Sequence, residues 1–217
     1  VFALALDPAT GGLYAAGQFA QAGGLTANNV AYWDGSAWST LGTGLAAAAL
    51  AAVWDTNTQS LYVGGIFTQA GGQAIRSIAR WQPSTSTWSA LGGDVGNVTA
   101  LAVDPATGRL FVGAFVDGVS SPNVAAWNGS AWEALGAGLD SAPSALLWDA
   151  SRSRLYAGGF FQSSGSTALS NVAMWDGSAW LALGDGVDGG VSALAHDPVR
   201  DRLFVGGSFQ NAGGAPA

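Results

Sequence analysis

The sequence has no cysteine and no lysine, and it has a single histidine, His196, among its 217 residues. The absence of cysteine excludes disulfides, thiolate metal sites and cysteine nucleophiles. Charged residues make up only 10% of the chain, and its formal net charge is −7. Because such a chain repels phosphate groups and its arginines are scattered, we expect no nucleic-acid binding. No run approaches the roughly 18 apolar residues of a membrane helix, so we expect no membrane insertion.

Glycine and apolar residues are abundant. The 33 glycines and 7 prolines would break helices of normal length. The apolar fraction of 49% is too high for a disordered chain. These counts favour a folded protein built of strands.

The chain consists of internal repeats. The segment LALDPATGGLYAAGQF, which begins at Leu4, returns four times with changes. Each copy is anchored by an aspartate, and the spacing between copies is 45 to 49 residues: Asp7, Asp55, Asp104, Asp149 and Asp197. A second segment of the form NVAYWDGSAWSTLG follows in four of the five units and carries a tryptophan pair: Trp33/Trp38, Trp81/Trp88, Trp127/Trp132 and Trp175/Trp180. Four full units and half of a fifth are therefore present.

Each unit predicts four short strands. The first, such as residues 99–104, is apolar almost throughout, which predicts burial on both faces. The Asp-Pro-Ala-Thr-Gly turn that follows is capped by its aspartate. The second strand, such as residues 61–67, contains the doublet Gly64-Gly65, which predicts close approach of another backbone or of a tryptophan ring.

The third and fourth strands are predicted to form a hairpin. The third strand ends at Asp-Gly or Asn-Gly, which favours a type I′ turn with positive φ at both residues. These dipeptides are Asp34-Gly35, Asn128-Gly129 and Asp176-Gly177. The fourth strand begins at the second tryptophan of each pair.

Four-stranded units of this length are typical of β-propellers, whose repeats span about 40 to 50 residues. We therefore predict an all-β fold with antiparallel blades at approximately 1–48, 49–97, 98–142, 143–190 and 191–217, the last incomplete. Closing the blades into a ring would remove the bare end faces. With half a unit missing, we expect an open arc or an incomplete five-bladed ring within residues 1–217. The rest of a longer chain or another chain would supply the missing strands.

The repeats resemble those of kelch and galactose-oxidase-type propellers, which share the glycine doublet of the second strand (Gly64-Gly65, Gly158-Gly159, Gly206-Gly207). Units of the form ALAVDPATGRLFVGGSF…NVAxWDGSAWxALG are also similar to repeats of large bacterial secreted or cell-surface propellers and of Rax2-related fungal ones. This resemblance implies a binding or display role and an extracellular or cell-surface location. It does not extend to the copper site of galactose oxidase, because that site needs a cysteine and several histidines.

Several polar residues invite a functional interpretation. His196 occupies the strand position held by Leu6, Trp54, Val103 and Trp148, which indicates packing. Five anchoring aspartates at equivalent positions indicate turn caps. A second acidic set leaves a calcium site as an alternative, although it lacks the D-x-[DN]-x-[DN]-G spacing of an EF-hand loop: Asp94, Asp140, Asp185 and Asp188. The sequence thus assigns no catalytic, cofactor-binding or metal-binding residue, and it leaves the ligand-binding residues unknown.

The variable positions point to binding. Tyr32, Arg80, Ala126 and Met174 share one third-strand site, and their variety predicts a solvated or partner-facing position. The connections between the second and third strands vary most, at 20–29, 68–77, 116–123 and 162–171. Since recognition usually resides in loops on a rigid scaffold, we predict a binding face there.

We expect a non-catalytic module that binds proteins through this loop face, with no cofactor. Two alternatives stay open. One is glycan binding at tryptophan pockets, although burial of the tryptophans in the core is favoured. The other is a purely structural repeat segment of a larger surface protein. An enzyme is disfavoured because titratable side chains are so few.

Overall fold

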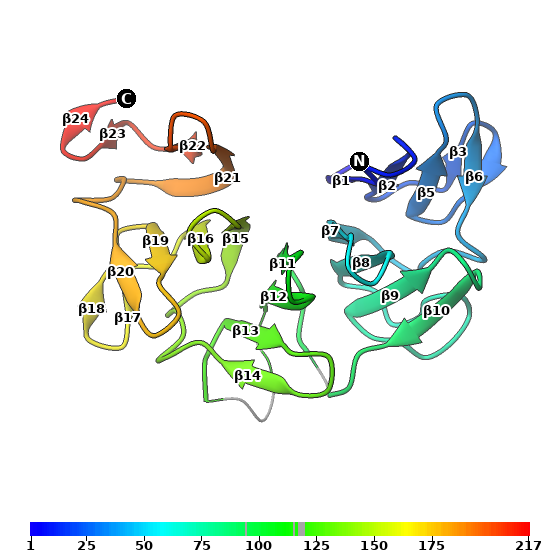
Figure 1. The fold of residues 1–217 in the computed structure, drawn as a ribbon, viewed down its shortest axis with the longest axis horizontal. Helices are drawn as coiled ribbons and strands as arrows, with labels where there is room; N and C mark the ends of the chain where they lie inside the picture. Colours follow the sequence, from blue (N-terminus) through cyan, green and yellow to red (C-terminus); the bar gives the residue numbers. More distant parts are fainter. Residues whose placement is uncertain (94, 115, 117–119) are drawn as a thin grey trace. The chain divides into compact units, whose positions relative to one another are not determined.

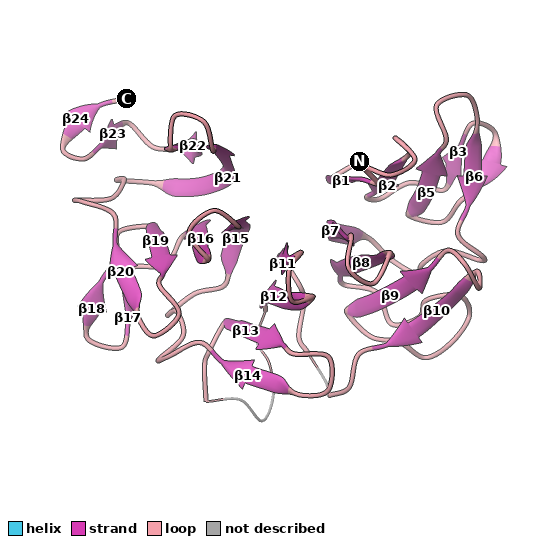
Figure 2. Cartoon of the chain, viewed as in Figure 1, coloured by secondary structure: helices cyan, strands magenta, loops and turns pink. Residues whose placement is uncertain are grey.

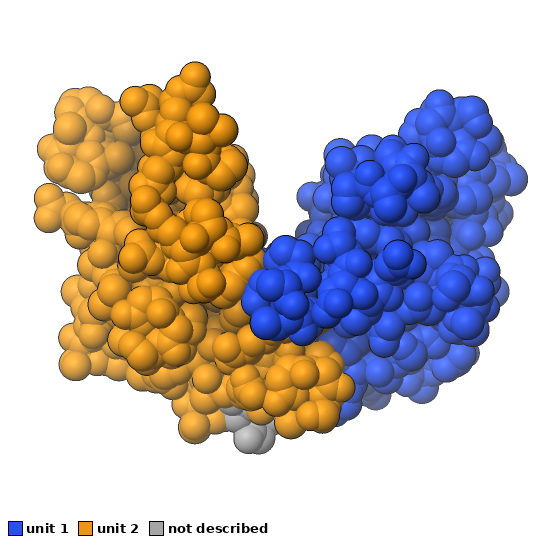
Figure 3. All heavy atoms as spheres, in the orientation of Figure 1, with its two compact units in different colours: residues 1–108 blue, residues 109–217 orange. Residues whose placement is uncertain are grey.

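The computed structural model describes residues 1–93, 95–114, 116 and 120–217. The chain divides into two compact units, residues 1–108 and 109–217 (Figure 3). In the described residues all regular structure is β-strand (Figure 2). That part of the chain accordingly holds no helix suited to crossing a membrane.

Unit 1 contains two antiparallel four-stranded sheets (Figure 1). The first has the order β1 (Ala3–Leu6), β2 (Leu13–Ala16), β5 (Val30–Trp33) and β6 (Trp38–Thr40). The second has the order β7 (Ala49–Asp55), β8 (Ser60–Gly65), β9 (Ile78–Gln82) and β10 (Thr87–Ala90). A small hairpin of β3 (Gln21–Ala22) and β4 (Leu25–Thr26) connects β2 to β5, and β11 (Ala100–Asp104) ends the unit.

Unit 2 repeats the same pattern. It begins with β12 (Arg109–Gly113), β13 (Val124–Trp127) and β14 (Trp132–Ala134), which pair in that order. A four-stranded sheet follows with the order β15 (Pro143–Asp149), β16 (Arg154–Gly159), β19 (Val172–Trp175) and β20 (Trp180–Ala182). Next comes the pair β21 (Gly190–Asp197) and β22 (Arg202–Ser208). Two small hairpins complete the unit: β17 (Ser163–Ser164) with β18 (Thr167–Ala168), and β23 (Asn211–Ala212) with β24 (Ala215–Pro216).

The predicted all-β class is confirmed, and these antiparallel four-stranded sheets are consistent with propeller blades. Third strands end directly before Asp34, Asn128 and Asp176, as predicted. Fourth strands begin at the second tryptophan of each pair or, in β10, one residue earlier. The second strand predicted at 61–67 ends earlier, at Gly65.

Burial of first strands on both faces is confirmed for β11, in which residues 100–103 are all buried. It is wrong for β1. Ala5 packs in the core of unit 1, whereas Leu4 and Leu6 are 58% and 56% exposed. Because side chains alternate along a strand, the two leucines lie on the face opposite the core.

The glycine doublets mark close approaches, but tryptophan rings do not make them. A Cβ on Gly64 would overlap Cγ1 of Val98, and one on Gly65 would overlap the carbonyl oxygen of Ala48. Gly158 is covered in the same way by Val191. The tryptophan part of the prediction is wrong, because the β-branched residue at the start of the following repeat fills this space.

The type I′ turn is also a wrong prediction. Positive φ occurs at Gly35 (100°) but not at Asp34. The register pairs Trp33 with Trp38, and the amide of Asp34 donates to the carbonyl of Ala37, so Gly35 and Ser36 are the central residues. This sign pattern is that of a type II′ turn. Asp34 instead stands before the turn, where its Oδ1 accepts from Ser36 N (2.7 Å) and Ala37 N (2.8 Å).

The variable connections are more regular than predicted. Residues 20–29 and 162–171 contain the hairpins β3–β4 and β17–β18. In the first of these, Gly23 and Gly24 take φ of 57° and 82°, which closes the hairpin within two residues. Of the predicted loop 116–123, residues 117–119 lie outside the described part of the chain.

Candidate functional site

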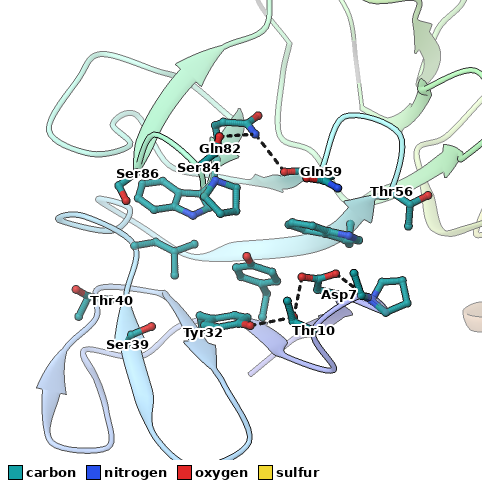
Figure 4. A pocket seen from close by; sticks show the side chains of 17 residues that line it. Asp7, Thr10, Tyr32, Ser39, Thr40, Thr56, Gln59, Gln82, Ser84 and Ser86 are labelled. Atoms are coloured by element: carbon teal, nitrogen blue, oxygen red, sulfur yellow. Dashed lines mark hydrogen bonds between the residues drawn. The ribbon is translucent and has the colours of Figure 1, made fainter.

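A pocket of about 520 Å³ lies in unit 1 where the first two repeats meet (Figure 4). The first repeat supplies the turn at residues 7–10, Tyr14 of β2, Tyr32 of β5 and the segment 39–41. The second repeat supplies Trp54, Thr56, Gln59, Trp81, Gln82 and the hairpin residues 83, 84 and 86. Turns between first and second strands and between third and fourth strands meet here. In a meander these turns share one end of the sheet, opposite the connections between second and third strands.

Aromatic rings form the pocket's apolar wall. The rings of Tyr14 and Trp54 stack with centroids 5.3 Å apart and planes inclined by 14°. Tyr32 also packs on Tyr14, with ring centroids 4.6 Å apart and planes inclined by 43°. Trp81, 6% exposed, adds a further indole. Two tyrosines and two tryptophans from four strands thus converge on one cavity.

Burial raises the pKa of Tyr14, and the nearby Tyr32 and Asp7 raise it further. Both neighbours act in the same direction because a tyrosinate beside other negative charges is disfavoured. Tyr14 therefore keeps its phenolic proton at neutral pH and remains a neutral side chain in the pocket.

A chain of hydrogen bonds fixes the polar side of the first repeat (Figure 4). Thr10 Oγ1 donates to Asp7 Oδ2 at 2.7 Å and lies 3.1 Å from the Tyr32 hydroxyl. Asp7 Oδ1 accepts from the amide of Ala9 at 3.0 Å. Both oxygens of Asp7 are thus occupied by its own turn, and the Tyr32 hydroxyl is held at the pocket wall.

Gln82 organises the opposite wall. Its Oε1 accepts from Ser60 Oγ at 2.7 Å and from Arg80 Nη2 at 2.8 Å. Its Nε2 donates to the carbonyl of Gln59 at 3.3 Å and to Ser84 Oγ at 3.2 Å. The carboxamide is therefore fixed in one orientation. Further hydroxyl groups belong to Ser39, Thr40, Thr56 and Ser86.

The pocket is almost without charge. Among the described residues that line it, Asp7 is the single ionisable acid or base other than the tyrosines. Aromatic faces opposed by hydroxyl and carboxamide groups suit a neutral ligand that has both an apolar face and several hydrogen-bonding groups.

The structure divides the tryptophans into two classes. Trp81, Trp88, Trp175 and Trp180 are buried, which confirms the core prediction for these four. The other six are partly buried, and one of them, Trp54, lines the pocket together with Trp81. In each repeat pair the two indoles contact each other at 5.2 to 5.7 Å.

The prediction for the variable third-strand site is wrong for two of its four members. Ala126 is fully buried and Met174 is 9% exposed. The register explains this, because the site pairs with the second-strand aromatic residue: Tyr14 with Tyr32, Tyr62 with Arg80, Phe111 with Ala126 and Tyr156 with Met174. Its side chain fills whatever space that ring leaves.

The anchoring aspartates cap their turns, as predicted. Asp55 is fully buried, and it accepts from Asn57 N at 2.9 Å and from Thr58 Oγ1 at 2.6 Å. Asp104, Asp149 and Asp197 make equivalent bonds to the residue two positions on.

The second acidic set links repeats. Asp140 accepts from Gln162 N at 2.8 Å and Ser163 Oγ at 3.0 Å, and Asp188 makes the equivalent bonds to residues 210 and 211. These bonds outweigh partial burial and hold the pKa of Asp140 below its usual range. Asp94 lies outside the described residues. In the described part of the chain Asp140, Asp185 and Asp188 form no common metal-ligand group.

His196 packs as predicted. Its ring lies 6.3 Å from that of Tyr156, in the position where Trp54 packs on Tyr14 and Trp148 on Phe111. Sequence reasoning missed that its ring also lies near two carboxylates, those of Asp149 and Asp201.

Sequence reasoning also missed Tyr14 and Gln82 as pocket residues. A signal for the first was available, because an aromatic residue recurs at this second-strand position: Tyr14, Tyr62, Phe111, Tyr156 and Phe204. Gln82 falls in the hairpin of the one repeat that lacks Asp-Gly or Asn-Gly, and nothing in its spacing marks it.

Comparisons with known proteins agree with this fold. A family model described as the Rax2 C-terminal beta propeller domain matches residues 1–146. Among curated proteins, none matches the sequence significantly. The chain is similar in structure to one chain of a solved structure titled "Crystal structure of Nidogen/Laminin Complex", with a TM-score of 0.62 and 14% identity. The similarity covers 92% of this chain and 71% of that one, and at this identity it shows the fold alone.

Proposed function

Because the chain belongs to the Rax2 C-terminal β-propeller family, we propose that it is a non-catalytic binding module whose pocket in unit 1 takes a neutral sugar. The observation that carries this proposal is the combination of stacked aromatic rings with a polar rim whose one charged group among the described residues, Asp7, is bonded within its own turn. An extracellular or cell-surface location belongs to the same proposal, since glycans are displayed there.

A sugar ring matches the chemistry of the pocket. Its C–H face packs against aromatic rings, and its hydroxyl groups bond to fixed hydroxyl and carboxamide groups. The volume of about 520 Å³ lies in the usual range for small-molecule sites and suits one or two sugar rings. An anionic ligand is disfavoured, because the one charged side chain among the described lining residues is the carboxylate of Asp7.

The test is a glycan-array screen followed by calorimetry with the best ligand. Trp54→Val removes the stacking indole and installs the residue found at the equivalent position of the third repeat, Val103. We expect binding to weaken at least about tenfold, which corresponds to about 1.4 kcal/mol. The matched control is Trp148→Val, which removes the equivalent indole outside the pocket and should leave the affinity unchanged.

Two results would contradict the proposal. One is a wild-type protein that binds no neutral glycan on the array. The other is a Trp54→Val variant that is folded by circular dichroism and binds as well as the wild type. If the protein bound none of the ligands tested, a purely structural role of the repeat segment would be favoured.

A protein partner on the loop face is the second candidate. Exposed apolar side chains on the connections between second and third strands favour it: Leu25 and Ile66 are 44% and 46% exposed, and Phe160 is 69% exposed. This candidate predicts that Ile66→Ser removes binding of the protein partner and that Trp54→Val leaves it intact. The glycan proposal predicts that Trp54→Val weakens glycan binding and that Ile66→Ser leaves it intact.

A further inference from the structure

We propose that Asp149, His196 and Asp201 in unit 2 form a binding site for a divalent metal ion of the zinc class. Asp149 ends β15, His196 lies near the end of β21, and Asp201 belongs to the turn after β21. One ligand atom from each of the three side chains lies within 4.8 Å of the others. The proposal is independent of the sugar pocket, which lies in the other unit.

Both carboxylates lie near the imidazole ring. Its Nε2 is 3.6 Å from Asp201 Oδ1, and its Nδ1 is 3.8 Å from Asp149 Oδ1. These separations are longer than hydrogen bonds. Zinc ligands at about 2.0–2.1 Å in a tetrahedral arrangement lie roughly 3.4 Å from one another. One donor atom from each of the three side chains thus lies near, though not at, the spacing of zinc ligands.

Two buried polar atoms in this cluster have no hydrogen-bond partner. They are Nε2 of His196, whose side chain is 9% exposed, and Oδ2 of Asp149, whose side chain is 1% exposed. Leaving such atoms unpaired is costly, and few native buried groups are left so. A cation bound to both would satisfy them together.

The chemistry of the donor set selects the ion. One imidazole nitrogen and two carboxylate oxygens, without any thiolate, suit zinc in a site with three protein ligands and water in the fourth position. Calcium and magnesium favour all-oxygen sites, so the imidazole disfavours them.

The site is reachable. His196 and Asp201 line a pocket of about 510 Å³ that also holds Arg152 and Tyr156. Arg152 pairs with Asp201 through Oδ2, which leaves Oδ1 toward the imidazole. Asp149 Oδ1 accepts from the amide and hydroxyl of Ser151, which orients Oδ2 as the free ligand atom.

The fold does not require these groups at these positions. Where this repeat has His196, the others have leucine, valine or tryptophan. Where it has Asp201, they have Gly11, Gln59, Gly108 and Ser153. All five residues share the left-handed backbone conformation, with φ between 48° and 73°. The backbone thus forms the same turn without an imidazole or a second carboxylate.

The experiment measures zinc binding by the full chain after treatment with a chelator and desalting. Calorimetry with Zn²⁺ alone should show one equivalent bound. Co²⁺ in its place should give the visible absorption of a low-symmetry site with nitrogen and oxygen ligands. His196→Trp installs the residue of the neighbouring repeat, Trp148, and so keeps a ring against Tyr156. We expect it to bind zinc at least about 100-fold more weakly, as loss of a direct ligand should cost more than the 10–100-fold of an outer one.

Asp201→Gly supplies a second variant that keeps the left-handed turn, and it should weaken binding to a similar degree. The control is Asp185→Asn, which removes an exposed carboxylate from the same unit and should leave zinc affinity unchanged. Zinc binding that is equally weak in the wild type and in His196→Trp would overturn the proposal. Loss of binding in Asp185→Asn as in the site variants would overturn it too, since affinity would then follow net charge.

Discussion

The indole nitrogen of Trp88 donates a hydrogen bond of 2.9 Å to the backbone carbonyl of Leu41, 47 residues earlier in the chain. Trp180 makes the equivalent bond of 3.0 Å to Leu135 in unit 2. In these two repeats the second tryptophan thus bonds to the residue that directly follows the fourth strand of the preceding repeat. This contact joins neighbouring repeats through a buried polar group.

We predict that Trp88→Phe destabilises the protein. The substitution leaves the buried carbonyl of Leu41 without its partner, which costs about 1–3 kcal/mol, and it adds a packing defect. Urea denaturation measures the change. Trp38→Phe is the control, because Trp38 is only partly buried, and it should cost less. If the two variants lost the same free energy of unfolding, the bond to Leu41 would contribute nothing to stability.

The glycine doublets give a prediction with a control inside the chain. Gly64→Ala places a methyl group against Val98 and should cost about 1–3 kcal/mol through overpacking. Gly206 stands at the equivalent position of the last repeat, but there the nearest atom to an added Cβ is 3.9 Å away, in Ala193. Gly206→Ala should therefore be neutral or slightly stabilising. Thermal and urea unfolding of both variants would show this difference, and a costly Gly206→Ala would contradict our explanation of the doublet.

Asn171 lies at the start of a third strand and is predicted to fix the segment that leads from its own repeat into the next. Its Nδ2 donates to the carbonyl of Val187 at 2.8 Å, and its backbone has φ of 68°. Asn29 and Asn123 make equivalent bonds to Leu45 and Leu139. Asn171→Ala loses the bond and forces alanine into the left-handed region, so we expect a loss of about 2–4 kcal/mol.

Asn171→Gly separates these two costs, because glycine adopts positive φ freely. In urea denaturation it should lose less stability than Asn171→Ala. If the glycine variant were as unstable as the alanine variant, backbone strain would play no part.

The hairpin aspartates predict a loss of stability in acid. Bonds from the amides of Ala179 and Ser178 and from the Ser178 hydroxyl lower the pKa of Asp176, and the Asp34 turn shows the same effect. A folded-state pKa below the unfolded value of about 3.9 means that the stabilisation is complete above that pH. It is lost as the pH falls through the folded-state pKa.

Asn128 provides the matched control for this effect, since its Oδ1 accepts the same bonds in the third repeat without ionising. At neutral pH, Asp176→Asn should therefore unfold at the same urea concentration as the wild type. As the pH falls to about 2.5, the urea midpoint of the variant should decrease less than that of the wild type. Parallel curves for the two proteins would contradict the assignment.

Most of the fold could be predicted from the sequence, because the signals are local and repeated. The anchoring aspartates bond to residues two and three positions on, so a short segment determines each turn. The tryptophan that opens the fourth strand marks that strand without reference to the rest of the chain. The wrong predictions concern features whose conformation or burial depends on contacts with other residues. Asp34-Gly35 is a strong hairpin signal, yet the pairing of Trp33 with Trp38 moves the turn one residue further.

The candidate sites could not be predicted in this way. Tyr14 and Trp54 are 40 residues apart, and Asp149 and His196 are 47 apart; only the packing of one repeat against the next brings each pair together. Repeat periodicity indicates which positions are equivalent, but not which side chains of adjacent repeats face one cavity. The sequence alone thus determined the strands, the aspartate-capped turns and the propeller class, because backbone hydrogen bonding and alternation act over a few residues. The tertiary structure decided the aromatic pocket and the histidine–carboxylate cluster, because both depend on the distance between side chains of separate sheets.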